Sequence, residues 1–293
     1  MKSFFFLFLL FYSFPLPAID WPSSPGNMVR NFGVNIFGLP HLGLTFNTSE
    51  TIQAAEGGDL LYFHDQKNKA SRLPSALGSW IAVDHGDGII SIYSRFGDQL
   101  PKEELIRTSN TGRIQRGMHL GEAGISGWAS RNGFFFQLYD RTEKRWINPL
   151  LIINSPTDIR PPDILSVRLI NSDGLVFFNP SPARNLSQGR YTVIVDTFDT
   201  MVRSNETPLA PHRITCFLNG REAGELNFES YSTRDGSLTV QRNGIVQVRQ
   251  VYANFPAFEI ADIWLSRGQA TLEIIVQDVS ENTRSMIYRF VVE

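Results

Sequence analysis

Apolar residues recur along this chain mostly at every second position or in short runs, and Gly, Pro, Asn and Asp separate the runs. Alternation of this kind is typical of half-buried β-strands, whereas a helix repeats its apolar positions every three or four residues. Clear strand segments in the first half are residues 60–63, 80–83, 89–93 and 134–138. No long stretch shows the helical spacing, so the pattern predicts an all-β protein.

The strand pattern is interrupted at residues 154–162, where Pro156, Pro161 and Pro162 lie among polar residues. Proline fixes φ and cannot donate a hydrogen bond to a strand ladder, so we expect a linker here. It would separate a first domain, residues 19–153, from a second, residues 163–293.

The second domain has evenly spaced strand segments, as in a β-sandwich. They are residues 164–169, 191–195, 214–218, 246–251, 270–276 and 288–292. In this pattern the domain resembles the immunoglobulin- or fibronectin-like modules of exported bacterial enzymes. Asp196 and Asp278 are each expected to close a strand and to begin a polar loop.

The first 18 residues have the pattern of a signal peptide. Lys2 supplies a positive charge, residues 4–14 are apolar except for Ser13, and Ala18 is a small residue at a cleavage position. An apolar run of about 10–12 residues is too short to cross a bilayer of roughly 30 Å as a helix. We expect cleavage after Ala18, no transmembrane segment in the mature chain, and export to the periplasm or cell surface of a bacterium. An uncleaved anchor is the alternative.

Composition limits the classes of protein to consider. Hydrophobic residues make up 42% of the 293, enough for a core in each half, and the formal net charge is −2. A nucleic-acid-binding domain normally has a strong basic excess, so we expect no nucleic-acid partner. The single cysteine, Cys216, excludes an intramolecular disulfide, and its apolar neighbours predict that it is buried.

Four stretches of the first domain together match a known family. They are Ile52 to Leu61 (IQAAEGGDLL), Gly78 to Gly88 (GSWIAVDHGDG), Ile114 to Gly124 (IQRGMHLGEAG) and Trp146 to Leu150 (WINPL). Through them, residues of roughly 32 to 153 resemble the lysostaphin-type zinc endopeptidases of peptidoglycan, also called LytM-like domains. The resemblance implies the LytM-like β-sheet fold, the duplicated hybrid motif.

The resemblance also implies a zinc site, which this sequence has lost. The family holds zinc with the His and Asp of an H-x-x-x-D motif and the second His of H-x-H, while two more histidines handle protons. Here His41 is kept, but Thr45 stands in the place of the Asp. Gly133 and Phe135 replace the two residues of H-x-H, and Arg95 replaces the remaining histidine. One imidazole falls short of the donors that zinc needs, so we expect no metal, no cofactor and no catalytic residue.

Five residues at this former cleft are candidates for a ligand groove: His41, Thr45, Tyr93, Arg95 and Phe135. A guanidinium can hold a peptide carboxylate through two parallel hydrogen bonds, which favours Arg95 as the principal contact. A salt bridge within the domain is the other interpretation of Arg95. Phe135 either lines the groove or forms strand core with its neighbours.

Two other histidines fall within the matched stretches. His85 lies in a glycine-containing turn and is predicted to have a turn and packing role. His119 stands where the family has an apolar strand residue, so we expect it to pack inward.

These features lead to three hypotheses of function. The first is an exported, non-catalytic peptidase-like protein of the cell envelope that binds peptidoglycan or regulates a cell-wall hydrolase. The second is an active zinc endopeptidase that cleaves peptidoglycan with atypical ligands. The third is a purely structural envelope module without a ligand groove.

Overall fold

We describe the protein from a computed structural model. It describes residues 19–36, 38–66, 75–97, 112–129, 131–153, 158–180, 186–201, 207–253 and 255–293. The predicted signal peptide and part of the predicted linker, residues 154–157, lie outside these ranges. Within them the chain forms strands and three short 3-10 turns but no α-helix, which confirms the all-β prediction. No helix in the described part has the length and apolar character to cross a membrane.

The first half contains twelve of the strands in the described ranges. They are β1 (Met28–Arg30), β2 (Asn35–Ile36), β3 (Leu39–Pro40), β4 (Leu44–Phe46), β5 (Thr51–Gln53), β6 (Gly58–His64), β7 (Ser79–Asp84), β8 (Ile89–Phe96), β9 (Arg113–Ile114), β10 (His119–Glu122), β11 (Phe134–Asp140) and β12 (Arg145–Ile147). Two 3-10 turns accompany them, at Pro25–Asn27 and Pro149–Leu151.

The second half contains longer strands. They are β13 (Asp163–Asn171), β14 (Val176–Phe178), β15 (Gly189–Phe198), β16 (Arg213–Leu218), β17 (Arg221–Arg234), β18 (Ser237–Arg242), β19 (Ile245–Gln247), β20 (Ala257–Leu265), β21 (Gly268–Gln277) and β22 (Thr283–Val292), with a 3-10 turn at Val248–Gln250. Asp278 directly follows β21, as predicted. Asp196 was expected to close a strand, but β15 continues past it, and its carboxylate lies 2.7 Å from Nη2 of Arg168.

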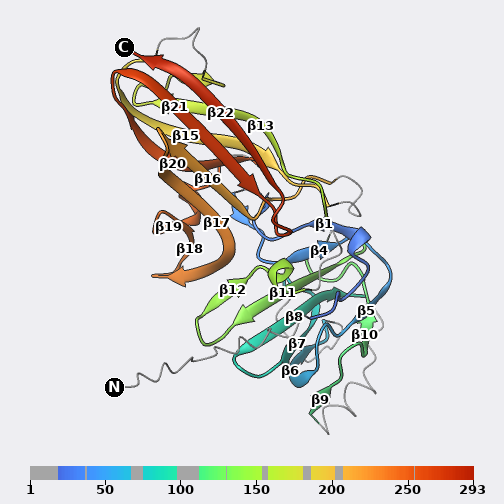
Figure 1. The fold of residues 1–293 in the computed structure, drawn as a ribbon. Helices are drawn as coiled ribbons and strands as arrows, with labels where there is room; N and C mark the ends of the chain where they lie inside the picture. Colours follow the sequence, from blue (N-terminus) through green and yellow to red (C-terminus); the bar gives the residue numbers. More distant parts are fainter. Residues whose placement is uncertain are drawn as a thin grey trace, which may run out of the picture.

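One antiparallel sheet runs through both halves, in the order β22-β21-β16-β17-β12-β11-β8-β7-β6-β9 (Figure 1). The halves join where β12 pairs with β17 and Trp146 lies opposite Tyr231. The long β17 curves, so that its first part belongs to the upper layers and its last part extends the lower sheet (Figure 1).

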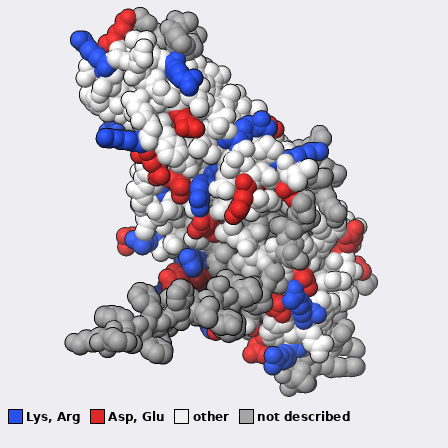
Figure 2. All heavy atoms as spheres, viewed as in Figure 1, with Lys and Arg blue, Asp and Glu red and all other residues white. Residues whose placement is uncertain are grey.

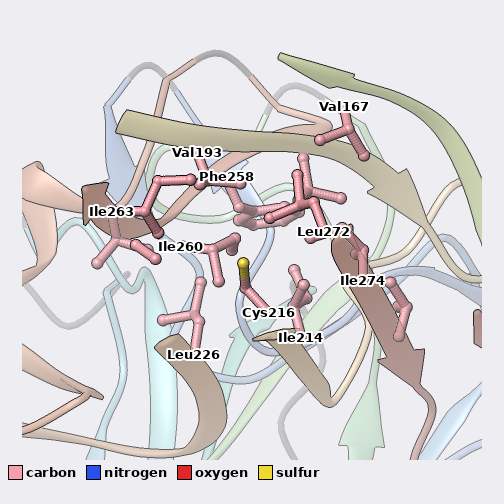
Figure 3. Close-up of a cluster of buried hydrophobic side chains, with 14 of the residues drawn as sticks. Val167, Val193, Ile214, Cys216, Leu226, Phe258, Ile260, Ile263, Leu272 and Ile274 are labelled. Carbon is pink, nitrogen blue, oxygen red and sulfur yellow. The ribbon is translucent and has the colours of Figure 1, made fainter. Parts of the chain in front are cut away.

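The second half is a two-layer sandwich, in which the sheet β14-β13-β15-β20 covers the strands β22, β21, β16 and β17. Figure 3 shows apolar side chains from both layers meeting between them, among them Val193, Phe258, Leu226 and Ile274. Cys216 lies fully buried in this core, as predicted, and burial raises the pKa of its thiol to about 12. The immunoglobulin or fibronectin type of this sandwich stays a prediction.

Each half contributes buried residues to the hydrophobic core of the other half. Phe32 and Val34 belong to the first half in sequence but are buried in the core of the sandwich. Asn31 holds this segment in place, because its side-chain amide donates to the carbonyl of Ala210 and accepts from its N–H at 2.7 and 2.8 Å. Conversely, Leu209 is buried in the core of the first half. The surface shown in Figure 2 carries acidic and basic side chains interspersed among neutral ones.

Candidate functional site

Three neighbouring strands, β4, β11 and β8, form the floor on which the predicted groove residues Thr45, Phe135 and Arg95 lie. Thr45 lies opposite Phe135, which in turn lies opposite Ser94. Side chains alternate along a strand, so Phe134 and Phe136 enter the core of the first half while Phe135 lies on the opposite face with Thr45. The aromatic run therefore divides between core and site.

His41 packs against this floor and is 7% exposed. Its Nε2 lies 2.9 Å from the hydroxyl of Thr45, and its ring stacks on Phe135 with centroids 4.7 Å apart. Burial, and next the positive charges of Arg30 and Arg95, lower the pKa of His41 to about 3. The imidazole is therefore neutral near pH 7, and one nitrogen already has a partner.

The residues described here do not fit a zinc ion. A zinc site needs three or four nitrogen, sulfur or oxygen donors in tetrahedral array. His41 supplies one imidazole, Phe135 has no lone pair, and the guanidinium of Arg95 repels a cation. In the described ranges the group of potential metal ligands that comes together is Asp158, Asp199 and Asp278, in another part of the fold.

The backbone around Gly133 leaves no space for a side chain at that position. A Cβ atom built on Gly133 would lie 2.2 Å from the carbonyl oxygen of Phe46, far inside any contact that real Cβ atoms make. Strands β4 and β11 approach so closely that position 133 has no room for a histidine.

Arg95 reaches the site because β8 contains a β-bulge. Ser79 pairs with Phe96 and Trp80 with Ser94, so Arg95 is an extra residue without a partner on β7. Its φ of +69° is unusual for a residue other than glycine and directs the side chain out of the normal alternation. The guanidinium carbon lies 5.6 Å from the ring centroid of Phe135, on the same side as Thr45.

Tyr93 does not belong to this site, which corrects its prediction as a groove residue. In a regular strand Tyr93 and Arg95 would share a face, but the bulge places them on opposite faces. Tyr93 is fully buried in the core of the first half, where its ring packs on Phe136 and its hydroxyl accepts the N–H of Ala55 at 2.8 Å.

A pocket of about 630 Å³ opens beside Arg95. Thr45, Arg95 and Gly133 form one wall, together with Arg30 and Arg131, while Thr207, Pro208 and Phe255 of the second half form another. His41 and Phe135, also predicted as groove residues, are not among the residues that line it. No Asp or Glu of the described ranges lines the pocket. Its walls can therefore hold an anion.

Arg95 has an unsatisfied hydrogen-bonding group at the pocket. Its Nε is buried and has no hydrogen-bond partner among the described residues. Burial, and next the charge of Arg30, lower the pKa of Arg95 from its ordinary value, but a guanidinium remains charged at neutral pH. The alternative interpretation of Arg95 was a salt bridge within the domain. Arg95 forms no salt bridge with a carboxylate of the described residues.

Sequence reasoning missed Arg30 and Arg131. Arg30 lies on β1 opposite Thr45, and Arg131 lies two residues before Gly133. The sequence signal for Arg131 was its nearness to the degenerate H-x-H motif. Arg30 had no such signal, because its place depends on the pairing of β1 with β4.

The two histidines outside the cleft differ from one another. Both ring nitrogens of His85 are hydrogen-bonded, to the carbonyl of Gly57 at 2.8 Å and to the hydroxyl of Ser91 at 2.7 Å, which confirms its structural role. His119 was predicted to pack inward, but it is exposed on β10, where the adjacent Leu120 turns inward instead.

Two comparisons of the sequence with known proteins find similarity. A protein-family model that names no function matches residues 161–293. An uncharacterized protein of Treponema pallidum (strain Nichols) is 26% identical over 129 residues, which is 41% of this chain and 86% of that protein.

Among solved structures, the fold is similar to lysostaphin-type peptidases and to a chain of the SpoIIQ–SpoIIIAH pore-forming complex. The match to that complex has 16% identity and a TM-score of 0.34, and covers 49% of this chain and 95% of the other. Lysostaphin from Staphylococcus simulans matches with 14% identity and a TM-score of 0.32 over 93% of this chain and 98% of its own. A zinc-containing peptidase from Vibrio cholerae matches with 17% identity and a TM-score of 0.35, over 45% of this chain and 39% of its own.

Proposed function

We propose that this chain is an exported, non-catalytic, peptidase-like protein of the cell envelope that binds a carboxylate-bearing peptide in the pocket at Arg95. The observation that carries this proposal is the pocket's charge. Three arginines, Arg30, Arg95 and Arg131, line it without an acidic residue of the described ranges.

The chemistry of Arg95 suits a carboxylate ligand. A guanidinium presents its donors in a planar fork that matches the two oxygens of a carboxylate. The buried Nε of Arg95 lacks a partner within the described protein, and a buried donor without a partner is costly. A ligand carboxylate in the pocket would pair with the guanidinium of Arg95, and the more exposed Arg30 and Arg131 would add attraction.

Peptidoglycan stem peptides, which carry free carboxylates, are the first ligand we propose, in keeping with the resemblance of the matched motifs. An acidic segment of a cell-wall hydrolase would present the same chemistry. The alternative of an active zinc endopeptidase is disfavoured, because the described residues around His41 supply neither a carboxylate nor a second imidazole.

The proposal can be tested with purified sacculi and with soluble stem peptides. We expect the wild-type protein to bind both, and Arg95→Ala and the double variant Arg30→Ala/Arg131→Ala to lose most of this binding. Arg141→Ala is the matched control, since Arg141 is an exposed arginine that pairs with Asp84 at 3.2 Å away from the pocket.

Three outcomes would contradict the proposal. Undiminished binding by Arg95→Ala would show that the pocket at Arg95 is not the binding site. Stoichiometric zinc together with cleavage of sacculi would favour the peptidase. Binding to a cell-wall hydrolase but not to sacculi or stem peptides would replace the proposed ligand by a protein partner.

A further inference from the structure

Three buried carboxylates converge at the junction of the two halves, away from the arginine pocket. Asp158 precedes β13, Asp199 directly follows β15, and Asp278 directly follows β21. One carboxylate oxygen from each lies within 4.8 Å of those of the other two. Their residues are 8%, 4% and 1% exposed, so all three are largely removed from water.

No positive side chain compensates this cluster among the described residues. None of the three carboxylates takes part in a salt bridge there. Burial, and next the charge of Asp278, raise the pKa of Asp199 to about 8. Burial raises the pKa of Asp278 as well. Like charges this close in a low-dielectric site require a proton or a cation.

Two of the carboxylates are held in fixed positions by hydrogen bonds. Asp278 accepts the backbone N–H groups of Ser280 and Asn282 at 2.8 and 2.9 Å, and the side-chain amide of Asn282 at 2.8 Å. The same amide donates to the backbone carbonyl of Asp158 at 2.9 Å, and Asp158 accepts the N–H of Arg160.

The carboxylate of Asp199, the third member of the cluster, has an oxygen without a hydrogen-bond partner. Oδ1 of Asp199 is buried and has no hydrogen-bond partner among the described residues. A buried acceptor without a partner is rare in folded proteins and requires an explanation such as an ion or water. Here the unsatisfied oxygen belongs to a cluster whose other members are already fixed in place.

We propose that Asp158, Asp199 and Asp278 bind a Ca²⁺ ion. An all-oxygen set of carboxylates suits a hard cation and not zinc, which favours nitrogen and sulfur donors. Ca–O distances of about 2.3–2.6 Å allow ligand oxygens to lie up to about 5 Å apart, as the cluster's oxygens do. Mg²⁺ usually keeps several waters, which a site this buried disfavours.

The position of the site gives the ion a structural role at the junction. The backbone of Asp199 pairs with that of Leu209 through two hydrogen bonds of 2.9 Å, and Leu209 is buried in the core of the first half. Met201 is buried in the same core, and Val279, next to Asp278, packs against it. A bound cation would hold strand ends of the sandwich against the first half.

The test is calorimetric titration of the EDTA-treated full chain with CaCl₂, together with thermal unfolding in CaCl₂ and in NaCl of equal ionic strength. We expect one Ca²⁺ per chain, weaker binding of Mg²⁺, and a melting temperature that rises with Ca²⁺ but not with NaCl. Asp199→Asn should lose the binding. Asp262→Asn, which alters an exposed aspartate paired with Arg190, should retain it.

Asp199→Asn also has a second readout. Because it removes a buried carboxyl group whose ionised form is disfavoured by burial and by the charge of Asp278, its melting temperature in EDTA should equal or exceed that of the wild type, although it no longer responds to Ca²⁺. If that variant does not fold, Asp158→Asn takes its place. Absence of Ca²⁺ binding by the wild type up to about 10 mM, well above the Kd range of extracellular calcium modules, would overturn the proposal. So would unchanged binding by a folded Asp199→Asn.

Discussion

The contact at Gly133 predicts that a zinc site of the kind that the motif resemblance implies cannot be built here by replacing side chains alone. The perturbation is Gly133→Ala, the smallest step towards the histidine of the family motif. Its Cβ would lie 2.2 Å from the carbonyl oxygen of Phe46, whereas ordinary contacts begin at 3.4 Å. Strands β4 and β11 would therefore have to separate by about 1.2 Å where Phe134 pairs with Phe46.

The magnitude follows from what that separation disrupts. Overpacking costs about 1–3 kcal/mol, and each weakened backbone hydrogen bond between β4 and β11 adds about 1 kcal/mol. We expect Gly133→Ala to lower the free energy of unfolding by on the order of 2–4 kcal/mol. For a protein of this size, that corresponds to a fall in melting temperature of roughly 5–15 °C. Gly133→His should be at least as destabilising.

The assay is denaturant unfolding followed by circular dichroism, with thermal melts alongside. Gly97→Ala is the matched control, because its Cβ would make only ordinary contacts, the nearest at 3.5 Å, and its φ is not positive. The quadruple variant Thr45→Asp/Arg95→His/Gly133→His/Phe135→His should fail to take up stoichiometric zinc as a folded protein. If Gly133→Ala were as stable as Gly97→Ala, the lack of space at Gly133 would be refuted.

Three further predictions concern the buried polar groups. Thr45→Val leaves Nε2 of His41 without its partner and should lower the free energy of unfolding by about 1–3 kcal/mol in urea; no change would show that the contact is dispensable. The folded pKa of His41, about 3, lies below its ordinary value of 6.5, so the unfolded chain takes up a proton first and stability should fall as pH drops from 6.5 towards 3. NMR titration of the ring checks this, and His41→Gln should weaken the dependence; a ring that titrates near 6.5 would contradict it. Cys216, buried with a pKa near 12, should react with a thiol reagent at pH 8 only after unfolding, and rapid native labelling would contradict its burial.

Local pattern was sufficient to predict the fold class but not the arrangement of strands. Short apolar runs at residues 89–93 and 134–138 correspond to β8 and β11. The continuation of the sheet from β12 to β17 depends on a pairing of Trp146 with Tyr231, which are far apart in sequence and carry no mutual signal. The burial of Phe32 in the sandwich core has the same long-range cause.

The residues of the candidate site could be predicted from the sequence where they occupy positions of a recognisable motif. His41, Thr45, Arg95 and Phe135 meet as the degenerate motifs indicated. The prediction that Tyr93 lines the groove was wrong, because the inserted residue Arg95, with its positive φ, places Tyr93 and Arg95 on opposite faces of β8. Strand alternation in the sequence cannot reveal such a bulge. Asp278 was recognised as closing a strand, but Asp199 was not, since β15 extends past the aspartate that the pattern favoured.

Residues 207–209 contact both proposed ligand sites, and this arrangement gives a last prediction. Asp199 of the carboxylate cluster pairs with Leu209, and Thr207 and Pro208, directly before Leu209, line the arginine pocket. If Ca²⁺ fixes Asp199, it also fixes the pocket wall, so less ordering remains for a peptide ligand to impose. Binding free energies are reciprocal, so Ca²⁺ should tighten peptide binding and the peptide should tighten Ca²⁺ binding by the same factor. Titrations of stem peptide in Ca²⁺ and in EDTA, repeated with Asp199→Asn, measure this factor. A peptide Kd that Ca²⁺ leaves unchanged in a wild-type protein that binds both would show that the segment transmits nothing, and that the cluster and the pocket act independently.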